Sequence, residues 1–70
     1  MDLIYYVMSL GEKIKAIRAR LLLTQRDLAK ELGTTQMTIV SWETGKSMPK
    51  IQSLKKLRDF CRKHGIDSLI

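Results

Sequence analysis

The chain has 70 residues, of which 44% are hydrophobic, and its 13 Lys and Arg against 7 Asp and Glu give a net charge of +6. This length supports one small domain, and this hydrophobic content excludes a disordered basic tail. A folded domain with a positive field indicates an anionic partner: nucleic acid, an anionic membrane surface or an acidic protein.

The cysteine content argues against both disulfides and metal sites. Cys61 is the single cysteine, so it cannot form an internal disulfide, and His64 alone beside it cannot complete a zinc site. We therefore expect no metal and no cofactor, and a fold held by packing in a reducing cytoplasm. The apolar run Leu3–Met8 has six residues, far fewer than the roughly 20 that cross a bilayer, so we also expect no membrane association.

The chain divides at its first helix signal. Residues 1–8 hold both tyrosines and one charge, and we treat them as an N-terminal extension or arm. An arm that packs across a dimer and a loose extension both fit this segment, and Leu3–Met8 is the one stretch that could form a strand. Residues 9–70 form the domain proper. Ser9 and Glu12 have the spacing of a capping box, and the apolar stripe that follows predicts a helix over about 10–22, with Leu10, Ile14, Ile17 and Leu21 on one face.

Two short helices follow in quick succession. Thr24 caps a helix over about 25–32, with Asp27 favouring its N-terminus, and Gly33 ends it. The hydroxyls of Thr34 and Thr35 then offer a new cap for a helix over 36–44, which Gly45 ends. Two short helices joined by a glycine-containing turn are the outline of a helix-turn-helix.

The last predicted helix follows a loop that ends at Pro49. Apolar residues at helical spacing predict a helix over about 50–64, ended by Gly65, and a short apolar end follows that could add one turn; the stripe consists of Ile51, Leu54, Leu57, Phe60 and Cys61. Caps at the helix starts and glycines at the helix ends agree with one another. We therefore predict an all-α fold, a compact bundle of four to five short helices.

Nothing in the sequence favours catalysis. His64 precedes Gly65 at a helix C-terminus, where its charge would favour the helix dipole. Cys61 lies on the apolar stripe, where a small buried hydrophobe is the ordinary explanation. No serine or carboxylate is placed to form a triad with the histidine, and the acids form no metal-like cluster. We therefore expect that the protein is not an enzyme.

Double-stranded DNA is the partner that the residues favour. The second helix of a helix-turn-helix enters the major groove, where its N-terminal residues reach base edges. Here these residues are uncharged: Thr35, Gln36, Met37 and Thr38, with Val40 and Ser41 one turn later. The amide of Gln36 can pair bidentately with adenine, and Met37 can contact a thymine methyl.

The residues that would neutralise phosphate flank this helix. They are Gln25 at the start of the preceding helix, Lys46 and Ser47 in the loop, and Lys50 at the start of the last helix. The five cations of the last helix are taken as a solvated face. An exposed acid beside DNA would repel phosphate, so we expect Glu43 to point inward to a cation, and we place Trp42 in the core.

These segments resemble the lambda-repressor/Cro-like family, also called XRE-type or Cro/C1-type. The likeness spans about residues 9–66 and is carried by Ile14–Arg18, Leu23–Ala29, Gly33–Gln36, Ile39–Lys46, Pro49 and Leu54. The resemblance implies that Thr35, Gln36, Met37 and Ser41 face the bases, and that Gln25 holds a phosphate and helps to orient Gln36. It also implies a largely buried ion pair between Arg18 and Glu43. Two departures are Met37, where relatives often have a polar residue, and Lys50, where they often have a serine cap.

The expected function is a sequence-specific transcriptional regulator. It would act in the cytoplasm, most simply as a repressor that binds a palindromic operator as a homodimer, because a monomer of this size reads few base pairs. The alternative is an antitoxin-type interaction module that masks a toxin protein and regulates its own operon. A domain held on anionic lipid is disfavoured, because no strongly amphipathic basic helix with aromatic residues is present.

Overall fold

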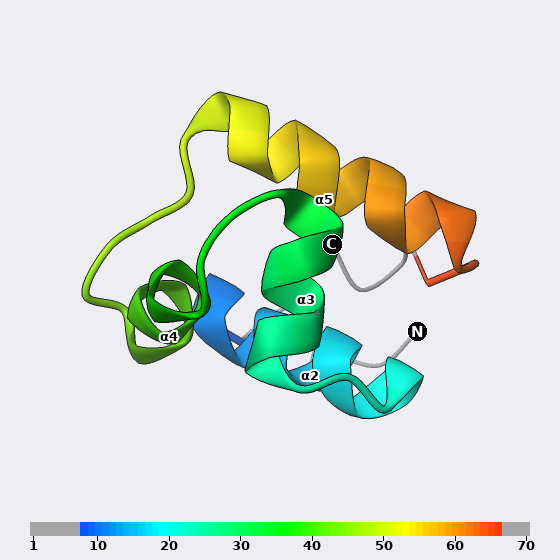
Figure 1. Cartoon of the computed structure of the whole chain (residues 1–70), viewed down its shortest axis with the longest axis horizontal. Helices are drawn as coiled ribbons and strands as arrows, with labels where there is room; N and C mark the ends of the chain where they lie inside the picture. The colour runs from blue at the N-terminus through cyan, green and yellow to red at the C-terminus, as the bar shows by residue number, and fades with distance from the viewer. Residues whose placement is uncertain (1–7, 67–70) are drawn as a thin grey trace.

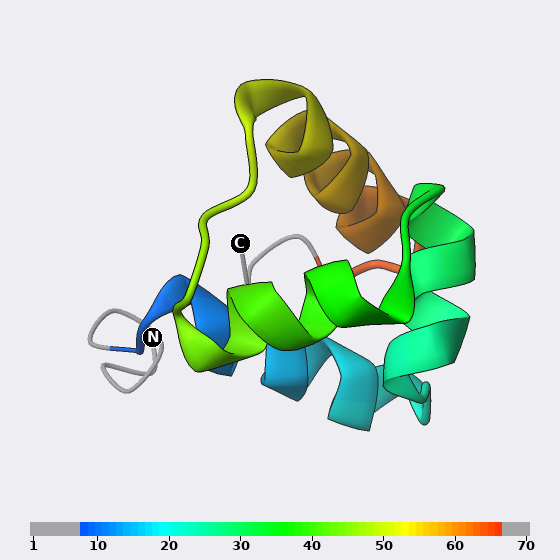
Figure 2. The same cartoon turned by 60° about the vertical axis from the view of Figure 1, so that its left-hand side comes forward.

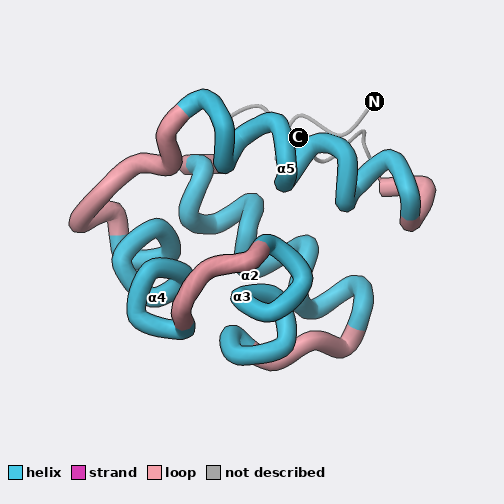
Figure 3. The backbone as a smooth tube through the Cα atoms, turned by 45° about the horizontal axis from the view of Figure 1, so that its top comes forward, coloured by secondary structure: helices cyan, strands magenta, loops and turns pink. Residues whose placement is uncertain are grey.

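The protein is an all-α bundle, as predicted. A computed structural model describes residues 8–66, and Figure 1 shows its helices α2 (Leu10–Leu21), α3 (Gln25–Leu32), α4 (Gln36–Thr44) and α5 (Ile51–Lys63). In this part of the chain the connections are loops and no strand is present (Figure 3). The arm predicted for 1–8, the strand considered for Leu3–Met8 and the extra turn after Gly65 fall, apart from Met8 and Ile66, outside the described residues.

Side-chain caps begin three of the four described helices. Capping boxes join Ser9 to Glu12 before α2 and Thr24 to Asp27 before α3, and Thr35 accepts a hydrogen bond from the Thr38 amide at the start of α4. The expected cap at every helix start is wrong for α5. This helix begins after Lys50, whose side chain makes no cap hydrogen bond, so the first amides of α5 have no side-chain acceptor.

All four described helices end in the same backbone arrangement. The residue after the helix, or one further on, is left-handed, and the next amide donates back to a carbonyl five residues earlier; the left-handed residues are Leu22, Gly33, Gly45 and Gly65. The expectation of a glycine at each helix end is wrong for α2, where the left-handed residue is Leu22, with a φ of 56°. The Leu23 amide bonds the Arg18 carbonyl at 2.9 Å and holds this leucine in place, although a left-handed Cβ crowds the following carbonyl.

The core lies where the four helices meet. In Figure 1, α3 stands at the centre with α2 below it, α5 across the top and α4 seen end-on at the left. Every helix contributes buried side chains: Ile14, Ile17, Leu28, Ala29, Leu32, Ile39, Trp42, Leu57, Phe60, Cys61 and, after α5, Ile66. The stripe predicted for the last helix is wrong at its first position, because Ile51 lies before the part of α5 that packs on the core and is 69% exposed.

The position of α4 decides which side chains the domain presents. Figure 2 shows α4 running along one side of the bundle, with its first turn beside α3 and its last turn beside the start of α2. The connection from α3 is short because Gly33 reverses the chain at once. One face of α4 is therefore packed against α2 and α3, and the other is left to solvent.

Candidate nucleic-acid interface

The two faces of α4 differ in chemistry. Ile39, Trp42 and Glu43 are buried, at the spacing that places side chains on one side of a helix. The opposite side carries neutral side chains that are exposed or half-buried, namely Gln36, Met37, Val40, Ser41 and Thr44. Met37 is 70% exposed. This outward face can therefore offer an amide, a hydroxyl and several apolar groups without bringing a charge.

The first turn of α4 is stabilised by two threonines. The Thr35 hydroxyl accepts a hydrogen bond from the Thr38 amide at 3.2 Å and lies 3.0 Å from the Thr38 hydroxyl. Thr35, expected to face bases, is therefore also the cap of the helix. The expected hydroxyl cap is thus Thr35, and the amide of Thr34 closes the preceding helix by donating to the Ala29 carbonyl at 2.9 Å.

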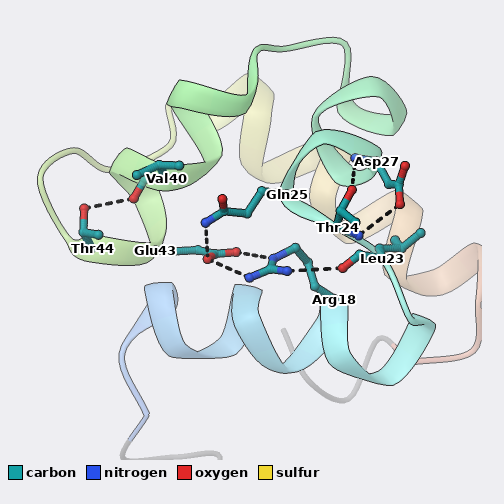
Figure 4. Close-up of polar contacts among 8 residues, drawn as sticks. All are labelled: Arg18, Leu23, Thr24, Gln25, Asp27, Val40, Glu43 and Thr44. Carbon is teal, nitrogen blue, oxygen red and sulfur yellow. Dashed lines mark hydrogen bonds and ion pairs between the residues drawn. The ribbon is translucent and has the colours of Figure 1, made fainter.

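A buried polar network holds the other end of α4. Arg18 of α2 and Glu43 of α4 form an ion pair through the Arg18 Nε, and the Arg18 Nη2 donates to Glu43 Oε1 at 3.0 Å. Gln25 of α3 donates its Nε2 to the same oxygen at 3.1 Å. Arg18 also donates to the Leu23 carbonyl at 3.2 Å. Figure 4 shows these side chains meeting from three helices, with the Leu23 carbonyl added from the turn between α2 and α3.

The network explains how an acid is tolerated in the core. The Glu43 side chain is only 2% exposed, and the Arg18 side chain is 21% exposed. Burial by itself raises the pKa of Glu43, but the hydrogen bonds from Arg18 and then Gln25 outweigh it and lower the pKa below its usual value. The hydrogen bond to Glu43 raises the pKa of Arg18. Both groups are therefore charged in the folded domain.

Gln25, expected to hold a phosphate and to help orient Gln36, is bonded to the buried ion pair. Its amide nitrogen is bonded to Glu43, and no hydrogen bond joins it to Gln36 among the described residues. Gln25 is half-buried, and its amide oxygen and second N–H are not used in this bond. The side chain therefore links the buried network to the surface.

The other expected phosphate ligands lie together in the segment that follows α4. Lys46, Ser47 and Lys50 are exposed in the loop before α5. The amides of Lys46 and Ser47 both donate to the Ser41 carbonyl, at 2.9 and 3.3 Å. The start of this loop is thus fixed to the last turn of α4.

Three residues that form or support the candidate interface were not predicted from the sequence. Thr44 is on the outward face, but its hydroxyl donates back to the Val40 carbonyl at 2.9 Å (Figure 4). The helical spacing from Gln36 through Val40 could have identified it. The Leu23 carbonyl, which accepts from Arg18, and Gly11, which lies against the end of α4, have no signal in the local sequence.

The described residues contain neither a candidate metal site nor a candidate membrane-spanning helix. Within residues 8–66, no group of three or more His, Cys, Asp or Glu side chains lies close enough to hold a metal ion. None of the helices described is long and apolar enough to cross a membrane.

Comparison with known proteins matches the sequence to a family. A family model described as "Helix-turn-helix" matches residues 14–65. An uncharacterized HTH-type transcriptional regulator of Methanocaldococcus jannaschii is 44% identical over 48 residues, which cover 69% of this chain and 73% of the relative. The HTH-type transcriptional activator BcrR of Enterococcus faecalis is 38% identical over 53 residues, which cover 76% of this chain. This chain spans about a quarter of the length of the Enterococcus protein (26%). No solved structure matches significantly.

Proposed function

The chain belongs to the helix-turn-helix family, and on that premise we propose that it is a transcriptional regulator that binds double-stranded DNA in a sequence-specific manner. Both relatives carry the words "HTH-type transcriptional" in their names. In the helix-turn-helix, the second helix of the motif lies in the major groove. This helix is α4.

The observation that carries the proposal is the outward face of α4. This face is neutral, and the opposite face of the helix is packed against α2 and α3. Base edges are read by hydrogen bonds and apolar contacts, which Gln36, Met37 and Ser41 can make, whereas an exposed charge would bind phosphate of any sequence. The one charge on α4, Glu43, is turned into the core and neutralised by Arg18. Thr35 would contribute its methyl group and its remaining hydrogen-bonding capacity beside the first base contact.

The net charge has a separate part in binding. Residues 34–50, which contain α4, contribute +1, whereas residues 11–33 and 51–70 contribute +3 each. Lys46, Ser47 and Lys50 would hold phosphates on one side of the reading face, and the free amide atoms of Gln25 would hold one on the other. These contacts supply affinity and orientation and carry no sequence information.

The finer features of the regulator follow from the size of the reading face. One short helix reads few base pairs, so we propose a homodimer on a palindromic site, with the half-sites about one helical turn apart. Repression is the simplest outcome, because occupation of a promoter suffices for it. A cytoplasmic location fits a protein that acts on bacterial or archaeal DNA.

Binding to selected DNA tests the proposal. A duplex is selected from a random pool with the wild-type chain, and affinities for it and for a scrambled duplex are measured by fluorescence anisotropy. Gln36→Ala is expected to lose about 1–3 kcal/mol on the selected duplex and little on the scrambled one. Gln52→Ala removes another exposed glutamine, in α5, and should leave the ratio of the two affinities unchanged.

The salt dependence of the same measurements tests the phosphate contacts. Lys46→Ala should weaken binding to both duplexes alike and reduce the slope of log affinity against log salt by about one. If the wild-type chain selects no preferred sequence, or if Gln36→Ala weakens both duplexes equally, α4 is not the reading helix. An antitoxin-type module that masks a toxin would then be the better hypothesis.

A further inference from the structure

Gly11 lies at the closest approach between α2 and the end of α4. It is buried in the first turn of α2. A Cβ at this position would stand 2.6 Å from the Glu43 carbonyl oxygen and 2.7 Å from the Trp42 carbonyl oxygen. Ordinary van der Waals contact begins at about 3.4 Å, and both atoms are backbone, so no side-chain rotation can relieve the clash. Any larger residue must push the two helices apart.

The glycine is not explained by the needs of α2 itself. Its φ is not in the left-handed region, unlike that of Gly33, Gly45 and Gly65, and glycine is the poorest helix former after proline. The capping box of Ser9 and Glu12 already fixes the start of the helix. The close approach to α4 is therefore the physical reason for a glycine here.

Gly11 and Arg18 act on the same turn of α4. They are seven residues apart, or about two helical turns, so they lie on the same side of α2. Arg18 holds the Glu43 side chain, and Gly11 contacts the main chain of Trp42 and Glu43. Figures 1 and 2 both show the first turn of α2 beside the last turn of α4. The ion pair thus fixes the direction of α4, and the glycine fixes its distance from α2.

A displacement of this turn moves the reading face with it. The helix α4 has nine residues, a length of roughly 14 Å at 1.5 Å per residue, and Gln36 to Ser41 occupy its first two turns. We propose that Gly11 is a positioning residue for DNA recognition: it seats α4 at the depth and tilt at which Gln36, Met37 and Ser41 reach base edges. This inference rests on the function proposed above. Phosphate contacts tolerate small shifts better than bidentate base contacts, so discrimination between sequences should suffer more than affinity for DNA in general.

The variant Gly11→Ala tests the role with the selected and scrambled duplexes. We expect the affinity for the selected duplex to fall at least tenfold and that for the scrambled duplex to change less than threefold. The control is Phe60→Leu in α5, a change in the core and away from α4 that should also lower the melting temperature. At a temperature where both variants are folded by circular dichroism, the control should keep the wild-type ratio of affinities.

Three results would overturn the proposal. One is a folded Gly11→Ala protein with the wild-type ratio, and another is an equal loss of affinity on both duplexes. The third is a Gly11→Ala protein with no cooperative melt even when Leu22→Gly is added to stabilise it, which would make the glycine a requirement for folding. Selection of a preferred duplex by the wild-type chain is measured first. If the wild-type chain selects none, the proposed function fails, and this result is distinct from the three above, which concern only the variant.

Discussion

Replacement of Arg18 by methionine should destabilise the domain strongly. The change removes both guanidinium hydrogen bonds from the Glu43 carboxylate and leaves Gln25 as its remaining donor. The Leu23 carbonyl loses its side-chain donor as well. A carboxylate that is 2% exposed is then left in the core without its cation, and breaking a buried pair in this way costs about 3–5 kcal/mol.

This loss is large compared with the stability of so small a domain. For 70 residues, the usual range per residue gives a free energy of unfolding of roughly 4–10 kcal/mol. The melting temperature of Arg18→Met should therefore fall by roughly 12–40 °C, at 4–8 °C per kcal/mol for domains of this size. Thermal and urea unfolding at pH 7, followed by circular dichroism, measure it.

A double variant separates the stranded charge from lost packing. Arg18→Met with Glu43→Leu removes both charges and should recover at least half of the loss, because an apolar pair can replace a buried ion pair at little cost. Lower pH gives a second check. Without Arg18, burial raises the pKa of Glu43, so protonation relieves the penalty, and the gap between Arg18→Met and the wild type should narrow as the pH falls from 7 towards 4. A melting temperature within about 5 °C of the wild type at pH 7 would refute the reasoning.

Two further predictions concern the helix ends and the carboxylates. Leu22→Gly should raise the free energy of unfolding by about 0.5–1 kcal/mol, because it relieves a left-handed leucine that is 91% exposed and packs little. The control Leu22→Ala should not raise it. A lower melting temperature for Leu22→Gly would contradict the argument. Hydrogen bonds hold the pKa of Glu12, Asp27 and Glu43 below their usual values. Unfolded carboxyls titrate near pH 4, so the wild type should keep this stability above about pH 4.5 and lose it as the pH falls further, where the unfolded chain binds more protons. Glu43→Gln should show a weaker dependence, and equal wild-type stability at pH 3 and pH 7 in urea titrations would exclude the mechanism.

The helix boundaries could be predicted because their signals are local. The caps at Ser9, Thr24 and Thr35 bond an amide three residues further on, and the glycines act through their own φ. Predicted and observed bounds consequently differ by at most one residue. The exceptions are Leu22 and Lys50, where a helix ends or begins without the preferred residue type. The sequence already showed that Lys50 stands where relatives often have a serine cap, whereas no residue around Leu22 indicates that it is left-handed.

Tertiary packing decided the features that bring together residues distant in the sequence. The sequence by itself indicated that Glu43 turns inward, because an acid beside DNA would be repelled, and family resemblance suggested Arg18 as its cation. Only the folded chain joins Gln25 to the pair, across 18 residues, and places Gly11 against the main chain of Trp42 and Glu43. Local hydrogen bonding and helical periodicity are properties of neighbouring residues, and they determined the helices and which neutral side chains share the outward face of α4. The depth and direction of that helix depend on where three helices pack together, and no local pattern encodes that contact.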